Sequence, residues 1–266
     1  MRTELAMDMG TVITSKNGPP EKHKDEANNS RKRLWPALLA GVEHTIDLGW
    51  RGWLALMLGA AAGWWIYVPL HELAHAFGCL AAGGGVSRLE LAPEYGAALL
   101  ADWLPFVYVG SDYAGQLTGF DTRGSDGIYL ITVLAPYALT LFPGVPLLLW
   151  SSHRSGAANC ALFGASLPWA LAPLLSLPGD YYEAGAILAS RTAAAWSGGA
   201  LPTHWRSDDL ALLLEERLSA GLLPLGDGLG IAAGFGIGVL LAALTLVLAV
   251  KLAQSFTASG HRSRAG

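Results

Sequence analysis

The chain has 266 residues, of which 52% are hydrophobic and only 14% are charged, and its formal net charge is −4. A typical soluble domain carries about 25% charged residues, so this composition indicates a membrane protein and argues against a soluble domain. The acidic balance provides no basic surface for nucleic acid, and we expect no nucleic-acid partner.

The N-terminal part of the chain is polar. Residues 1–33 contain Gly18-Pro19-Pro20 and a run of mixed charge, which predicts a disordered tail. Residues 34–50 are too few and too charged to cross a bilayer, so we expect a juxtamembrane helix there.

Four long apolar runs follow, at residues 53–82, 128–150, 157–178 and 228–250. Each is close to the roughly 20 residues that a transmembrane helix needs, and the first should be kinked or broken near Pro69. The predicted fold is an all-α polytopic membrane protein with about four transmembrane helices. Its parts are a membrane core at 51–190, an outer loop at 191–227, a C-terminal transmembrane helix at 228–252 and a tail at 253–266.

Both long loops carry signs of local structure. Val86-Ser87-Arg88-Leu89-Glu90-Leu91 alternates as a strand does, residues 106–109 are also strand-prone, and residues 119–127 have turn chemistry, so the first loop should hold a small β element. In the second loop, residues 208–220 have leucines at helical spacing, which predicts a short amphipathic helix.

Basic residues set the expected orientation, because they favour the cytoplasmic side of a membrane. They precede the first run, lie between the second and third, and follow the fourth: Arg31, Lys32, Arg33, Arg51, Arg154, Lys251, Arg262 and Arg264. Both termini are therefore expected to be cytoplasmic, with the two acid-rich loops facing outward. The small size of the chain favours a bacterial inner (plasma) membrane.

The segment His71-Glu72-Leu73-Ala74-His75 lies inside the first apolar run, where ionisable groups are costly. On a helix, the two histidines lie one turn apart on one face and can bind a single Zn²⁺. Glu72 then lies beside the metal-bound water as a general base. The alternative is a pair of polar groups that holds neighbouring helices together by hydrogen bonds.

A catalytic zinc normally has three protein ligands and a water, so the two histidines require a partner. Asp180 and Glu183 follow the third run, and the expected orientation places both at the same depth as the histidines. If this segment is helical, the two acids share a face, and one can bind metal while the other orients a histidine or the water. Alternatively, either acid is a solvated loop residue or a helix cap.

The HExxH helix, the Gly-rich turn after it and the Val86–Leu91 strand together resemble the site-2 protease family of intramembrane zinc metalloproteases. The resemblance covers about residues 53–188. It implies a third core helix whose Asp, followed by glycines, completes the zinc site. This chain departs from the family's usual Leu-Asp-Gly. Matching the family's glycines to Ala184-Gly185-Ala186 makes Glu183 the ligand, whereas matching the Asp residue type after Pro178-Gly179 makes Asp180 the ligand. We favour Asp180.

The expected function is therefore that of a zinc-dependent metalloendopeptidase, which hydrolyses a peptide bond of a membrane-associated substrate by a zinc-activated water. Zn²⁺ is the expected cofactor, and the bilayer and a membrane protein or peptide are the expected partners. An extended substrate would add to the sheet edge near residues 86–91. The alternative is a non-proteolytic membrane scaffold, a pseudoprotease that keeps the fold: the irregular second motif favours it, and the intact Glu72 argues against it.

Overall fold

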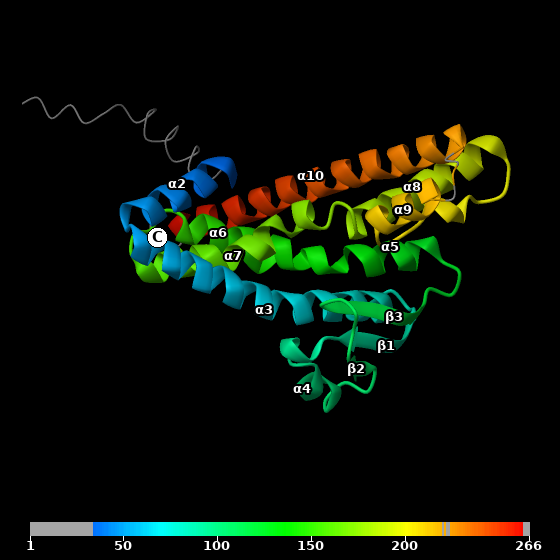
Figure 1. Ribbon diagram of the computed structural model, residues 1–266. Coiled ribbons are helices and arrows are strands. Elements are labelled where there is room, and N and C mark those ends of the chain that lie inside the picture. The colour runs from blue at the N-terminus through cyan, green and yellow to red at the C-terminus, as the bar shows by residue number, and fades with distance from the viewer. Residues whose placement is uncertain (1–33, 220, 222–223, 263–266) are drawn as a thin grey trace, which may run out of the picture.

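Four helical segments that are long and apolar enough to cross a membrane make up most of the fold (Figure 1). They span Trp50–Ala81, Asp126–Ser151, Ala157–Ser197 and Leu225–Ser255. This arrangement confirms the predicted helical, polytopic fold with four spans. The structure is a computed structural model that describes residues 34–219, 221 and 224–262, so the predicted tail at 1–33 and residues 263–266 lie outside the described part.

The first two helices are α2 (Leu34–Asp47), which is the predicted juxtamembrane helix, and α3 (Trp50–Ala81), which carries the HExxH segment. The helix is not broken near Pro69, because α3 is one continuous helix through this residue. Proline removes only one backbone hydrogen bond. The packing of α3 against α5 (Asp126–Leu134) and α7 (Ala157–Leu175) holds the helix together on either side.

The second and third spans are discontinuous. The second consists of α5, a 3₁₀ turn at Ala135–Tyr137, a π-helical turn at Thr140–Gly144 and α6 (Val145–Ser151), with prolines in both irregular turns. The third consists of α7 and α8 (Asp180–Ser197), separated by residues 176–179. The outer loop predicted to begin at 191 therefore begins only after α8 ends.

The remaining helices are a 3₁₀ turn at Thr203–Trp205, α9 (Leu210–Ser219) and α10 (Leu225–Arg262). α9 is the predicted amphipathic helix, and its Leu213 is buried. α10 extends beyond the predicted boundaries of 228–252, so part of the predicted tail is helical. Residues 251–254 are good helix formers, and nothing there stops the helix where the apolar run ends.

Glycines allow two pairs of helices to pack closely. A Cβ on Gly59 of α3 would lie 1.9 Å from the carbonyl oxygen of Ala161 in α7, and a Cβ on Gly185 of α8 would lie 2.0 Å from that of Gly234 in α10. Small residues bring membrane helices into close contact in this way. The helices of the pairs α3–α7 and α8–α10 are thereby closely packed.

A three-stranded sheet follows α3, as the sequence predicted. It consists of β1 (Gly85–Leu91), β2 (Val107–Val109) and β3 (Gly115–Asp121), in the order β2-β1-β3. β1 pairs with β2 in parallel and with β3 in antiparallel orientation. Short helices at Pro93–Tyr95 and α4 (Ala97–Ala101), which the sequence did not predict, connect β1 to β2.

The sheet differs from two expectations. β1 is the central strand, so the predicted substrate edge at residues 86–91 is paired with β3 along its length and with β2 at Leu89–Leu91. Gly119, Phe120 and Asp121, predicted to form a turn, belong to β3. Gly119 pairs with Arg88 so closely that a Cβ would lie 2.6 Å from Arg88 Cβ. A glycine that looks like a turn signal is here required for strand pairing.

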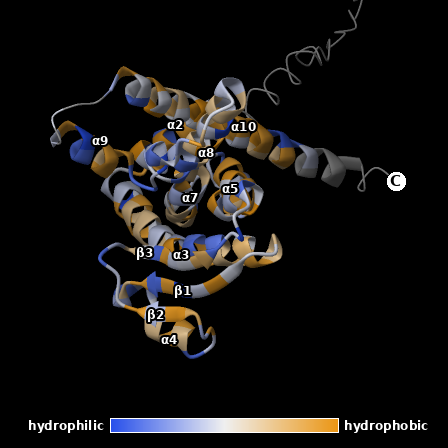
Figure 2. Cartoon of the chain, turned by 90° about the vertical axis from the view of Figure 1, so that its right-hand side faces the viewer, coloured by the Kyte–Doolittle hydropathy of each residue, from blue (hydrophilic) through white to orange (hydrophobic). Residues whose placement is uncertain are grey.

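The sheet lies against α3, beside the helix bundle (Figure 2). Leu73 and Ala76 of α3 form one hydrophobic core with Leu89 and Leu91 of β1. The indole of Trp64 also donates a hydrogen bond of 3.2 Å to the Tyr95 hydroxyl. These contacts fix the sheet next to the HExxH turn of α3.

Candidate metal centre and cleft

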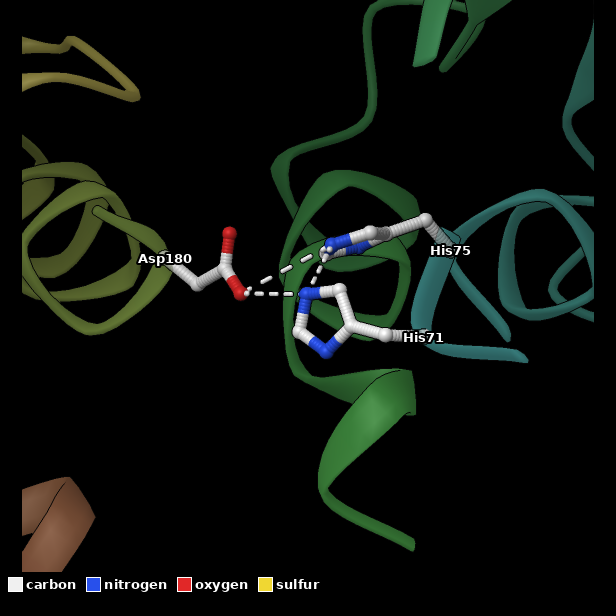
Figure 3. Close-up of side chains that lie close together, drawn as sticks. All are labelled: His71, His75 and Asp180. Atoms are coloured by element: carbon white, nitrogen blue, oxygen red, sulfur yellow. Dashed lines mark hydrogen bonds and ion pairs between the residues drawn. The ribbon is translucent and has the colours of Figure 1, made fainter. Parts of the chain in front are cut away.

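Three predicted ligands converge in the middle of the molecule (Figure 3). His71 and His75 extend from α3, and Asp180 extends from the first turn of α8. The two histidine Nε2 atoms are 3.2 Å apart, and Asp180 Oδ2 lies 3.3 Å from His71 Nε2 and 3.6 Å from His75 Nε2. Ligands at about 2.1 Å from a tetrahedral zinc lie about 3.4 Å from one another, so this spacing fits such an ion.

Neighbouring groups hold each ligand in place. His75 Nδ1 lies 2.8 Å from the carbonyl oxygen of Thr132, which can only accept a hydrogen bond. Nδ1 therefore carries the proton, and the Nε2 lone pair faces the cluster. The Tyr67 hydroxyl lies 2.7 Å from His71 Nδ1, and the Tyr137 hydroxyl donates to Asp180 Oδ2 at 2.7 Å. Such outer partners are the usual support of metal ligands.

Removal of either tyrosine hydroxyl is expected to weaken metal binding without abolishing it. Tyr67→Phe and Tyr137→Phe each leave the ligands intact but free one of them to rotate, so we expect a ten- to hundredfold loss of zinc affinity, on the order of that seen for outer partners elsewhere. Competition with a chromophoric chelator measures this affinity. Tyr113→Phe, an exposed change at the cleft rim, is the matched control. An unchanged affinity in both variants would contradict the assigned role.

The structure distinguishes Asp180 from Glu183, the two acids that the sequence offers as the third member of the cluster. Residues 176–179 end α7, so Asp180 is the first residue of α8 and points back toward α3. Glu183 is buried one turn later and lies outside the metal cluster, where it accepts a hydrogen bond from the Tyr129 hydroxyl. Asp180, the favoured residue, is the acid that joins the histidines. The supporting tyrosines were not identified from the sequence, although Tyr67 lies one helical turn before His71.

A cavity of about 600 Å³ opens beside the cluster. Glu72 lines it together with the three ligands, and Thr132 and Val133 of α5 form part of its floor. One wall is β3, and the opposite wall is the segment 206–212, which leads into α9. Glu72 and the cluster of His71, His75 and Asp180 therefore share one cleft.

No protein-family model, no curated protein and no solved structure matches the chain.

Glu72 is held close to the first residue of β3. A Cβ on Gly115 would lie 2.5 Å from Glu72 Cγ and 2.7 Å from Leu91 Cδ2, so only glycine fits there. The β3 backbone therefore passes directly over the Glu72 side chain. This contact places an edge strand and a carboxylate together beside the metal cluster.

Proposed function

We propose that the chain is an intramembrane zinc metalloprotease that hydrolyses a peptide bond of a membrane-associated substrate. The observation that carries this proposal is the cluster of His71, His75 and Asp180 in the same cleft as Glu72, within apolar spans. Ionisable side chains are costly at such depth, so a set that converges with metal-ligand spacing favours a function over helix packing.

Zinc is the proposed metal because two histidines and one carboxylate are a common catalytic zinc set. When bound, zinc supplies a Lewis acid and lowers the pKa of a coordinated water to about 7. His71, His75 and Asp180 would hold the ion. Hydrogen bonds from these ligands to Tyr67, Thr132 and Tyr137 would keep the metal-binding atoms of the ligands directed at it. This arrangement leaves one side of the cluster open to the cleft.

Glu72 is the proposed general base. Its carboxylate lines the cleft next to the cluster, where it can take a proton from the attacking water and pass it to the leaving amine nitrogen. The close approach of Gly115 restricts the Glu72 side chain, so the carboxylate is positioned before a substrate arrives.

The free edge of β3 is the proposed binding site for the substrate backbone, in place of β1. Ala92 N donates to Ala114 O across the sheet at 3.1 Å, and Leu91 pairs with Gly115. By the alternation of antiparallel pairing, the N–H and C=O of Gly115 then point away from β1, toward the free edge. A substrate strand added there would pass beside Glu72.

Gly115→Ala is expected to lower the rate of peptide hydrolysis about ten- to hundredfold at unchanged zinc content. The added Cβ forces Glu72 out of place but touches none of the metal ligands. Gly127→Ala is the matched control, because its Cβ would meet nothing closer than 3.5 Å. Equal rates of hydrolysis in Gly115→Ala and Gly127→Ala would contradict the proposal that β3 positions Glu72.

The end of the bundle that carries Arg51, Arg154 and Lys251 is proposed to face the cytoplasm. The two ends of the described chain, in α2 and α10, lie at this same end (Figure 1). The sheet, α9 and the mouth of the cleft would then face outward, both termini would be cytoplasmic, and the proposed membrane is a bacterial inner membrane.

The test is hydrolysis of single-span membrane peptides by the protein reconstituted in lipid vesicles, with products identified by mass spectrometry. A protease yields defined fragments that disappear with a zinc chelator and return on zinc addition. A scaffold binds zinc and yields no fragment from any peptide tried, including water-exposed ones, and that result would favour the non-proteolytic alternative.

A further inference from the structure

The two walls of the cleft are attached to different parts of the bundle. The β3 wall belongs to the sheet, whose core packs on Leu73 and Ala76 of α3. The opposite wall, residues 206–212, is attached to α5, α8 and α10. Access to the metal cluster therefore depends on what joins the two walls across the mouth.

The wall formed by residues 206–212 is firmly held on its own side. Arg206 makes two hydrogen bonds to the Asp126 carboxylate, at 2.7 and 3.0 Å, and both side chains are largely buried. The Leu210 backbone N–H donates to Pro178 O at 2.9 Å, and Leu213 packs in a core with Tyr182. A paired Arg–carboxylate contact of this kind is a strong, directional link.

Across the cleft the connection is much weaker. Gln116 Nε2 of β3 donates to Asp208 Oδ2 at 3.1 Å, and this contact is exposed to solvent. Within the described residues it is the only hydrogen bond between β3 and residues 206–212. Gln116 and Asp208 both line the cavity, so the bond joins the two walls of the cleft. Figure 2 views this end of the bundle, with α9 and the sheet on different sides of α3.

We infer that the Gln116–Asp208 hydrogen bond is a latch that holds the two walls of the cleft together and must break before a peptide can lie along β3. The inference rests on the proposed function for its substrate, but the latch itself is a property of the two walls. An exposed side-chain bond contributes little, so its loss shifts an opening equilibrium by a modest factor. The Arg206–Asp126 contact would remain as the fixed anchor about which the mouth opens.

The test measures access to the floor of the cleft, and it needs neither zinc nor turnover. Val133 is 3% exposed and lines the cavity, so Val133→Cys places a thiol below the latch. In a background with Cys79→Ala and Cys160→Ala, the rate of reaction with a charged maleimide reports opening. Gln116→Ala and Asp208→Ala, one on each wall, are each expected to raise this rate about three- to tenfold.

Ser87→Ala is the matched control, because it removes another exposed hydrogen bond to the same strand, from Ser87 Oγ to Gly119 O. The latch predicts faster labelling in the Gln116 and Asp208 variants and an unchanged rate in the control. Unchanged rates in both latch variants, or an equal rise in the control, would overturn it. If the labelling rates follow the latch prediction but the protein binds no zinc, the latch stands and the proposed function is contradicted.

Discussion

Glu72→Gln is expected to lower the rate of peptide hydrolysis by about 10²–10⁴-fold, because the amide cannot accept the proton that the carboxylate takes. The substitution keeps the shape of the side chain and leaves His71, His75 and Asp180 unchanged, so zinc content should remain at the wild-type value. Product formation in reconstituted vesicles and elemental analysis of the same preparation measure the two quantities.

Glu94→Gln is the control for the Glu72 experiment. It makes the same chemical change on the exposed connection after β1, outside the cleft lining. The control is expected to keep full activity. Wild-type activity in Glu72→Gln would show that another group moves the proton, and loss of zinc would show that Glu72 acts on the metal site instead.

Asp180→Ala is expected to abolish tight zinc binding, whereas Glu183→Ala is expected to keep it. Asp180 Oδ2 lies 3.3 and 3.6 Å from the two histidine Nε2 atoms, and its loss leaves only two protein ligands. Glu183 accepts a hydrogen bond from Tyr129 and lies outside the cluster. Titration with zinc against a competing chelator should show a loss of at least about a hundredfold in affinity for Asp180→Ala alone.

The two acids are a matched pair, since they lie three residues apart in the same helix and both line the cleft. If Glu183→Ala loses zinc and Asp180→Ala retains it, Glu183 is the third ligand, as the match to Ala184-Gly185-Ala186 indicates, and Asp180 is not. Loss in both variants would mean that the first turn of α8 depends on both acids.

The local part of the site could be predicted from the sequence alone. Two histidines four residues apart in an apolar helix define their own geometry, since the period of a helix places them on one face. Strand β1 and the amphipathic helix α9 were likewise visible as local alternation and leucine spacing. These features depend on neighbours within about two helical turns, which a sequence displays directly.

The non-local part could not be predicted in the same way. The third run was expected to end at Pro178, yet the chain turns and continues as α8, and this turn brings Asp180 to the histidines. The pairing of β3 beside β1, which makes β1 the central strand, also depends on contacts distant in sequence. No sequence pattern marks Tyr67 and Tyr137 as partners of the ligands, because any hydroxyl group in the right place can hydrogen-bond to a ligand.

The most direct test of the proposed metal centre is the zinc content of the detergent-purified full chain after zinc supplementation and removal of excess metal. About one zinc per chain is expected in the wild type, and none above background in His71→Ala. An absence of stoichiometric metal from every wild-type preparation would contradict the metal centre and the protease built on it, and would leave a set of polar residues that join α3 to α8.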